Sequence, residues 1–477
     1  MAGWTSPFNL LTTEFEQRAD EGCVIPGTLR QRYNELHPVH DQWNYLKIDP
    51  LYNDLMALEE DPLRAAAEPN DLAAIRALRP EGPRDLKYQP SDAELLDRLH
   101  GAWTGRCVGC ALGKPVEGMG MGRDALNQLK GRQEIKRYLQ GRGDWPLTNY
   151  FSNQPVEDGL KIWCTASQRE NIQYMEGDDD IHYSLTGLGV IEESGPAFTW
   201  QDVGRYWLSH IPVAHICTAE TQAVTNLQMV SARGTEGCAC PAFTRRHRNP
   251  YREWIGAQIR SDGWAWVCAG KPELAAEFAW RDAHWTHERN GIYGEMMFAA
   301  IQAAAFVEGD ALRLVAIGLS EIPADCRLAQ WTRTCLGWIA QEKDFESCMA
   351  RLEKELQTMH AVHTINNALI CIVALVYGRM DPNAATAIAV MCALDTDCNG
   401  ATVGSITGAH AGKKRFGGTL APQLNDTICP SMVGFQKVTM QELAARTLVQ
   451  WKRVDAYWTE RLAKRQETAP KARLASA

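Results

Sequence analysis

The sequence lacks an apolar run long enough to cross a membrane. The longest run, residues 368–377, has about half of the roughly 20 residues that a transmembrane helix needs. The first ten residues, MAGWTSPFNL, contain neither the basic nor the apolar segment of a secretory signal peptide. We therefore expect a soluble protein located in the cytoplasm.

The chain also lacks an excess of basic residues. Lys and Arg number 49 against 58 Asp and Glu, so the formal net charge is −9. Binding to duplex nucleic acid needs a basic face that displaces counterions, so this composition argues against such a partner. The 45% hydrophobic content argues against a disordered chain.

The fifteen cysteines lack the close spacing of a disulfide-stabilised domain. They are spread over 477 residues, and without a secretory signal we expect reduced, mostly buried thiols. Cys238 and Cys240 could suggest zinc, but no second pair follows at ligand spacing. A lone C-x-C pair is usually incidental.

Strand-like alternation is scarce, whereas helical periodicity is frequent from residue 91 onward. Ser91 and Glu94 have the spacing of a capping box, as do Thr439 and Glu442 near the C-terminus. Further helical patterns span residues 181–191, 272–285, 294–307, 366–377 and 384–394. The last two are apolar around the whole helix, which indicates complete burial. These patterns predict a large all-α domain.

The same signals divide the chain into four parts. Residues 1–90 are rich in Pro and charged residues and end in a turn-prone stretch, which is typical of an extension on a main domain. We expect the main domain over residues 91–435 and a C-terminal helix over residues 436–463. The polar tail, residues 464–477, is expected to be disordered.

Glycine recurs at every fourth residue in two segments. The two ladders are Gly101, Gly105, Gly109 and Gly113, and Gly400, Gly404, Gly408 and Gly412. Each glycine inside a helix costs about 1 kcal/mol against alanine, so a ladder needs a compensating gain. On one helical face, glycines let another helix or a ligand approach the backbone closely. Tight helix packing accounts for the ladders by itself and is the favoured interpretation.

Two acidic clusters stand at the expected starts of helices. Asp178–Asp180 precede residues 181–191, and Asp395 and Asp397 follow the apolar segment 384–394. One acidic residue at such a position caps free N–H groups and complements the helix dipole. Adjacent carboxylates, however, repel each other unless a cation or solvent screens them. The clusters therefore predict either helix caps or a site for Mg²⁺, Mn²⁺ or Ca²⁺.

Four motifs together resemble the ADP-ribosylglycohydrolase superfamily. They are GAWTGRCVGCALGKPVE at 101–117, the three aspartates at 178–180, the segment RDAHWTH at 281–287, and LDTDCNGAT at 394–402. The resemblance covers about residues 95–430 in the expected order. It implies a single large, orthogonal all-α domain with a binuclear Mg²⁺ centre, which hydrolyses N- or O-glycosidic bonds to ADP-ribose.

The resemblance also implies roles for individual residues. Glu117 matches a glutamate that contacts metal or water and acts as general base. The residues at metal-binding positions are Asp178, Asp179, Asp180, Asp395 and Asp397. The residues expected to face the substrate, most of them in or beside a glycine-containing loop, are His287, Asn290, Gly291, Tyr293 and Asn399. For His287, a hydrogen-bonded structural role is the more common one in such a setting.

Three positions depart from the family pattern. Cys110 stands where the family has Asp, Cys398 where it has Thr or Ser, and Asp178 where it has Thr. A thiol is a poor Mg²⁺ ligand, so Cys398 would leave its place to water or to Asn399. The extra carboxylate of Asp178 should tighten cation binding and repel a pyrophosphate. The substrate is then expected to be a smaller, less charged glycoside or nucleoside.

These inferences lead to a metal-dependent glycoside hydrolase acting on an ADP-ribosyl or smaller ribosyl or glycosyl substrate. Two Mg²⁺ ions, with Mn²⁺ or Ca²⁺ as alternatives, would bind the sugar diol and a water from which Glu117 takes a proton. The alternative is a catalytically silent member that binds nucleotides or a protein partner. The enzymatic interpretation requires Asp179 and Asp397 to meet in the folded chain.

Overall fold

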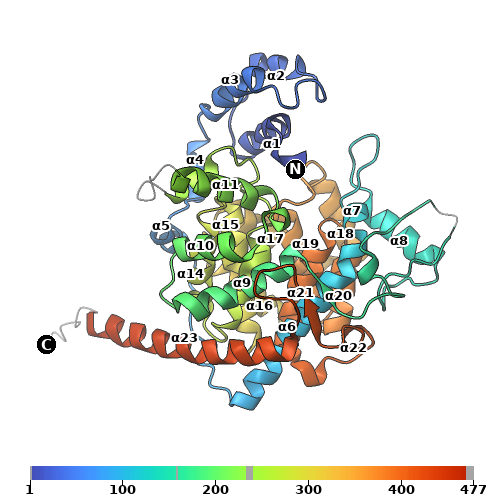
Figure 1. The fold of residues 1–477 in the computed structure, drawn as a ribbon, viewed down its shortest axis with the longest axis vertical. Coiled ribbons are helices and arrows are strands. Elements are labelled where there is room, and N and C mark those ends of the chain that lie inside the picture. The colour runs from blue at the N-terminus through green and yellow to red at the C-terminus, as the bar shows by residue number, and fades with distance from the viewer. Residues whose placement is uncertain (1–2, 157–158, 233–239, 469–477) are drawn as a thin grey trace.

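The computed structural model describes residues 3–156, 159–232 and 240–468, and most of these residues are helical (Figure 1). The all-α prediction is confirmed. No helix in the described part of the chain is long and apolar enough to cross a membrane. Cys238, one half of the C-x-C pair, lies outside the described residues.

The helices fall into an N-terminal group, a main domain and a C-terminal helix. The N-terminal helices are α1 (Pro7–Asp20), α2 (Gly27–Asn34), α3 (Tyr45–Met56), α4 (Pro62–Ala67) and α5 (Leu72–Leu78). The main-domain helices are α6 (Asp92–Gly113), α7 (Glu117–Gly120), α8 (Gly131–Gly141), α9 (Asp179–Ser194), α10 (Trp200–His210), α11 (Thr218–Ala232), α12 (Pro241–Arg246), α13 (Ser261–Trp266), α14 (Pro272–Ala283), α15 (Asn290–Ala305), α16 (Ala311–Leu319), α17 (Arg327–Gln341), α18 (Phe345–Glu355), α19 (Thr364–Tyr377), α20 (Pro382–Met391), α21 (Thr396–Ala411) and α22 (Leu420–Gln423). The C-terminal helix is α23 (Met440–Thr468).

Helices α6 and α21 lie antiparallel at the centre of the main domain, with their glycine ladders facing each other (Figure 1). A Cβ atom added at Gly105 would lie within 3.0 Å of the Gly404 carbonyl oxygen. One added at Gly109 would lie equally close to the Gly400 carbonyl oxygen. The two backbones are therefore in direct contact, and the helix-packing interpretation of the ladders holds.

Capping residues mark the starts of α6 and α23, as the sequence predicts. The Ser91 hydroxyl accepts a hydrogen bond from the Glu94 backbone N–H at 3.2 Å. The Thr439 hydroxyl accepts one from the Glu442 backbone N–H at 3.0 Å. The last helix, however, continues to Thr468, through residues that the sequence assigns to a disordered tail.

A short three-stranded sheet connects the first acidic cluster to the C-terminal part of the chain. Strand β1 (Met175–Glu176) pairs in parallel with β2 (Thr427–Cys429), and β2 pairs antiparallel with β3 (Val438–Thr439). Because β1 ends two residues before Asp178, this pairing fixes where α9 begins.

Helices α4 and α5 run along the side of the main domain, whereas α1, α2 and α3 form a layer at one end of the molecule, with α2 and α3 outermost (blue in Figure 1). Their apolar side chains, such as Leu11, Ile48 and Leu55, form a cluster separate from the main core. Ala219 and Tyr251 of the main domain belong to the same cluster. The extension is therefore packed on the main domain through shared apolar contacts.

The backbone contact between α6 and α21 can be tested with a matched pair of glycine variants. We expect Gly105→Ala to lower the free energy of unfolding by about 3 kcal/mol, because the added methyl group overpacks the interface. Gly337 lies exposed in α17, and a Cβ atom there meets nothing within 4 Å. Gly337→Ala should instead stabilise by about 1 kcal/mol. Denaturant unfolding measures both, and a wild-type midpoint for Gly105→Ala would contradict the contact.

Candidate active site

One cavity of about 470 Å³ brings the two acidic clusters together. Its wall includes Glu117, Asp178, Asp179, Asp395 and Asp397. Asp179 and Asp397 are about 200 positions apart in the sequence, yet they line the same cavity. The meeting of these two segments, on which the enzymatic interpretation depends, is therefore present in the fold.

The contact between α6 and α21 places Glu117 beside the second acidic cluster. Where α6 ends and α21 begins, the Thr396 hydroxyl donates a hydrogen bond to the Gly113 carbonyl oxygen at 2.8 Å. Only one 3-10 turn then separates Gly113 from Glu117. Glu117, Asp395 and Asp397 can each offer a carboxylate oxygen within 4.8 Å of the other two.

Asp178 is both the cap of α9 and a wall of the cavity. Its Oδ1 atom accepts a hydrogen bond from the Asp180 backbone N–H at 3.0 Å. Its Oδ2 atom lies 3.0 Å from Lys114 Nζ, which also donates to the Gly177 carbonyl oxygen at 2.7 Å. Burial acts to raise the pKa of Asp178, but Lys114, the Asp180 backbone N–H and His182 together outweigh burial, and the pKa falls to about 2. The negative charge of Asp178 is thus compensated by the ammonium group of Lys114.

Asp180 is fully buried behind the cavity wall, where it is paired with Arg106. Arg106 Nη2 lies 2.6 Å from Asp180 Oδ1, and Arg106 Nη1 lies 3.1 Å from Asp262 Oδ2. Among the described residues, the other oxygen of Asp180 has no hydrogen-bond partner. Potential ligand atoms of Asp180, Asp397 and Cys398 lie within 4.8 Å of one another. Asp180 therefore connects the first acidic cluster to the second.

The remaining carboxyl groups of the cavity have raised pKa values. Burial, followed by the charge of Asp395 and its acidic neighbours, raises the pKa of Glu117 to about 8. The same two causes raise the pKa of Asp179 and of Asp397. Several carboxylates can remain ionised together in a buried site only when positive charge compensates them. Oxygen donors of this kind suit a hard divalent cation, so the residues present fit a magnesium-type centre.

Three of the residues expected to face the substrate belong to the first turn of α15 instead of a loop. Asn290 donates a side-chain hydrogen bond to Glu253 Oε2 at 2.8 Å. The Tyr293 hydroxyl donates to the Pro69 carbonyl oxygen at 2.5 Å. A side chain at Gly291 would collide with neighbouring backbone. These residues do not line the acidic cavity, and we do not retain them as part of the site.

The other two expected substrate residues, His287 and Asn399, are also buried outside the cavity wall. His287 Nδ1 lies 2.8 Å from the Thr286 hydroxyl, and its Nε2 lies 3.8 Å from Glu220. Asn399 donates a side-chain hydrogen bond to Asn367 at 2.8 Å. Both residues support the site from behind, which matches the structural role that is more common for such a histidine.

Among the residues of the cavity wall that the sequence patterns did not single out are Trp4, Trp163, Glu220 and Trp254. Glu220 accepts a hydrogen bond from Arg260 Nη1 at 2.6 Å, and burial raises its pKa to about 7. Arg260 also bonds Asp282 at 2.6 Å, so it does not pair with its sequence neighbour Asp262. The one sequence signal for the tryptophans is that they fall outside the periodic apolar segments.

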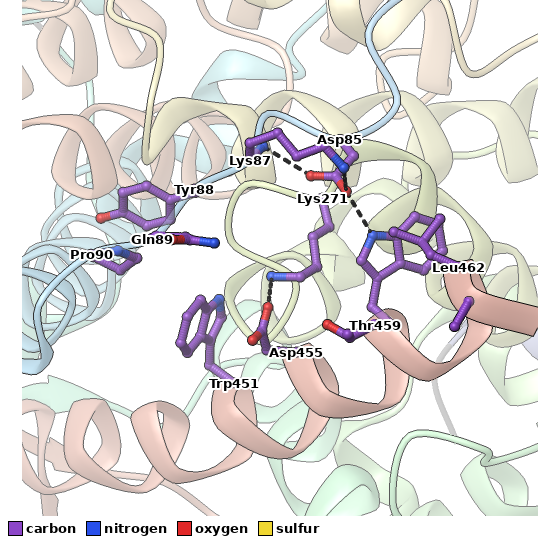
Figure 2. Close-up of a pocket in the computed structure, with 12 residues that line it drawn as sticks. Asp85, Lys87, Tyr88, Gln89, Pro90, Lys271, Trp451, Asp455, Thr459 and Leu462 are labelled. Atoms are coloured by element: carbon purple, nitrogen blue, oxygen red, sulfur yellow. Dashed lines mark hydrogen bonds and ion pairs between the residues drawn. The ribbon is translucent and has the colours of Figure 1, made fainter. Parts of the chain in front are cut away.

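A second cavity, of about 500 Å³, lies between α23 and the segment before α6 (Figure 2). Lys271 Nζ lies 2.8 Å from Asp455 Oδ1 and 4.7 Å from the centre of the Trp451 ring. The Trp458 indole N–H donates to Asp85 Oδ2 at 3.1 Å. Because these polar groups are paired with one another, we interpret them as contacts that attach two parts of the chain to α23: the segment before α6, through Asp85, and the start of α14, through Lys271.

Comparison with known proteins gives one family. A sequence model of the ADP-ribosylglycohydrolase family matches residues 91–455. No curated protein matches the chain. A solved structure titled "ADP-ribosylglycohydrolase-related protein complex" is 17% identical with a TM-score of 0.46, and the alignment covers 76% of this chain and 99% of that one.

The crowded carboxylates predict how stability without metal depends on pH. When the protein is folded, Glu117 keeps its proton up to about pH 8, but it loses that proton near pH 4.5 when unfolded. The free energy of unfolding in EDTA should therefore fall as pH rises through this window. Asp397→Asn removes one charge from the cluster, so its decline should be smaller, by about 1 kcal/mol at pH 8.

Thermal and denaturant unfolding at pH 5 and pH 8 measure this difference. Glu355→Gln, which changes an exposed acid on α18, is the matched control and should follow the wild-type curve. If Asp397→Asn shows the same pH dependence as wild type, the carboxylates do not repel each other in the folded state.

Proposed function

The chain belongs to the ADP-ribosylglycohydrolase family, and we propose that it is a metal-dependent glycoside hydrolase. It would cleave an N- or O-glycosidic bond of an ADP-ribosyl or smaller ribosyl or glycosyl substrate. The observation that carries this proposal is the single cavity lined by Glu117 and by both acidic clusters.

Asp178, Asp179, Asp395 and Asp397 are the residues that would hold two Mg²⁺ ions, and Mn²⁺ or Ca²⁺ would suit the same oxygen donors. Asp180 would add a further donor from behind the wall, since one of its oxygens lacks a hydrogen-bond partner among the described residues. Bound ions would supply Lewis-acid activation of water and a template for the sugar hydroxyls.

Glu117 is the proposed general base. Its carboxylate takes a proton from the water that attacks the anomeric carbon, while the bond from that carbon to the aglycone breaks. In the metal-free fold the pKa of Glu117 is raised to about 8, and cations bound beside it would lower that pKa, so that Glu117 is ionised and accepts a proton near neutral pH. The carboxylate lies beside Asp395 and Asp397, so it would act next to the ions that those residues hold.

The two thiols of the site do not replace these carboxylates. Burial raises the pKa of Cys110 and of Cys398 well above the usual value, so both remain protonated. Only a thiolate is an effective nucleophile or metal ligand. In the metal-free fold neither position therefore offers a thiolate as nucleophile.

Removal of either late aspartate should abolish the response to cations. For the wild type, Mg²⁺ at 100 times its Kd should add about 2.7 kcal/mol to the free energy of unfolding. Asp395→Ala and Asp397→Ala should lose most of this gain and the hydrolytic activity, whereas Glu355→Gln keeps both. A Mg²⁺ titration followed by thermal unfolding measures the effect. If both alanine variants respond as wild type does, the metal assignment is wrong.

Replacement of the general base should separate catalysis from cation binding. We expect Glu117→Gln to lower kcat by at least about 100-fold, with most of the Mg²⁺-dependent stabilisation retained by the aspartates. Suitable substrates are ADP-ribosyl-arginine, ADP-ribosyl-serine, 1″-linked ADP-ribose compounds and simple ribosides, each with and without Mg²⁺. If the wild type releases no product from any of them but binds one, the protein is a catalytically silent binding member of the family.

A further inference from the structure

The N-terminal extension lies outside the family match, yet it forms part of the acidic cavity. Trp4, in the 3-10 helix η1 (Gly3–Thr5), lines the cavity together with Glu117 and the acidic clusters. The region that matches the family begins at residue 91 and does not by itself contain this wall. The extension therefore adds a side chain to the site.

Buried polar contacts hold the extension in place on the main domain. Arg252 is fully buried, and its Nη2 atom lies 2.7 Å from Glu14 and 2.7 Å from Glu21. The Gln17 amide donates to Glu253 Oε1 at 2.9 Å. Separation of these partners would leave buried charges uncompensated, which is strongly unfavourable. The extension is thus a fixed part of the cavity.

One hydrogen bond and two ring contacts connect Trp4 to Tyr251, Trp254 and His360 of the main domain. The Tyr251 hydroxyl donates to the Trp4 carbonyl oxygen at 2.6 Å, and the Tyr251 ring packs against Trp254 at 4.6 Å. Trp254 in turn stacks on His360, with ring centres 4.0 Å apart and an angle of 14° between the planes. Trp4, Trp254 and His360 all line the cavity, as does Trp163. The cavity therefore combines flat apolar rings with an acidic cluster.

The charge of the cavity does not suit a diphosphate. None of the described residues that line it is a Lys or an Arg. Six of them are acidic, namely Glu117, Asp178, Asp179, Glu220, Asp395 and Asp397. Asp178 and Glu220 are already paired with Lys114 and Arg260, so the +4 charge of two bound divalent cations would balance the other four carboxylates and leave no positive charge for a diphosphate. A substrate part that lies beyond the cations is therefore better uncharged than anionic.

We propose that Trp4 determines substrate specificity by stacking on a flat, uncharged aglycone. The preferred substrates would be nucleosides or aryl glycosides in place of ADP-ribosyl compounds. The sugar hydroxyls would lie on the acidic cluster, and the aglycone ring would lie among the indoles, where stacking is favourable for any planar ring. This inference rests on the proposed hydrolase function and names the substrate class for it.

Variants of two tryptophans in the full-length protein test the role of the extension. Trp4→Leu keeps apolar volume but removes the flat ring, Trp4→Phe restores a ring, and Trp43→Leu changes an exposed tryptophan of the same extension, which is the matched control. The substrates are adenosine, 4-nitrophenyl ribosides and methyl ribosides, both anomers of each riboside, and ADP-ribosyl-arginine, all in Mg²⁺. Kinetics give kcat and KM separately for each variant.

We expect Trp4→Leu to raise KM about tenfold for adenosine or the 4-nitrophenyl ribosides. Methyl ribosides, which offer no ring to stack, should show an unchanged KM. Trp4→Phe should stay within about threefold of wild type, and Trp43→Leu should match it. The wild type should have a higher kcat/KM for the uncharged aromatic substrates than for ADP-ribosyl-arginine.

Two results would overturn the inference about Trp4 without contradicting the proposed hydrolase function. They are an equal effect of Trp4→Leu on methyl and aromatic ribosides, and a wild-type preference for ADP-ribosyl-arginine. If the wild type hydrolyses no glycoside, the proposed function fails instead. Titration calorimetry with adenosine and Mg²⁺ then decides the role of Trp4 alone: about tenfold weaker binding by Trp4→Leu supports it, and equal binding rejects it.

Discussion

The direct contact between the α6 and α21 backbones is the constraint on which the site depends. Each glycine in the ladders weakens its own helix by about 1 kcal/mol, and the close contact of two backbones offsets this loss. The ladders also fix the register of the two helices. A shift of one helix along the other by one glycine position would be four residues, or about 6 Å along the helix axis. That distance exceeds the 4.8 Å within which Glu117, Asp395 and Asp397 can place their oxygens.

The acidic residues of the site divide into two electrostatic classes. Asp178 is paired with Lys114, which compensates its charge, whereas burial raises the pKa of Asp180 to about 8 despite its pairing with Arg106. The carboxylates around Glu117 have raised pKa values because burial and neighbouring negative charge oppose their ionisation. The first class fixes the start of α9. The second class destabilises the metal-free folded protein, because its buried carboxylates repel one another, and a bound divalent cation would relieve this repulsion. Metal affinity and metal-free instability therefore have the same origin.

The extension and the main domain share one continuous polar and aromatic network. Glu253 receives hydrogen bonds from Gln17 of the extension and from Asn290 of α15, and it pairs with Arg327 at 2.7 Å. One residue further along the chain, Trp254 lines the acidic cavity. Asn290, which the sequence motifs assign to substrate binding, therefore belongs to the network that holds the extension in place. The extension in turn forms part of the cavity wall.

The helical architecture and the identity of the acidic clusters could be predicted from the amino-acid sequence alone. Capping residues such as Ser91, periodic apolar positions and the four-residue glycine spacing are local properties, so a single chain segment contains all the information they need. Which side chains reach the cavity could be established only from the folded chain. His287 belongs to one of the motifs but is buried behind the cavity wall, whereas Trp4 lies far outside the motifs and lines the cavity. Whether a side chain faces a cavity depends on the packing of several distant segments, and no local pattern encodes that arrangement.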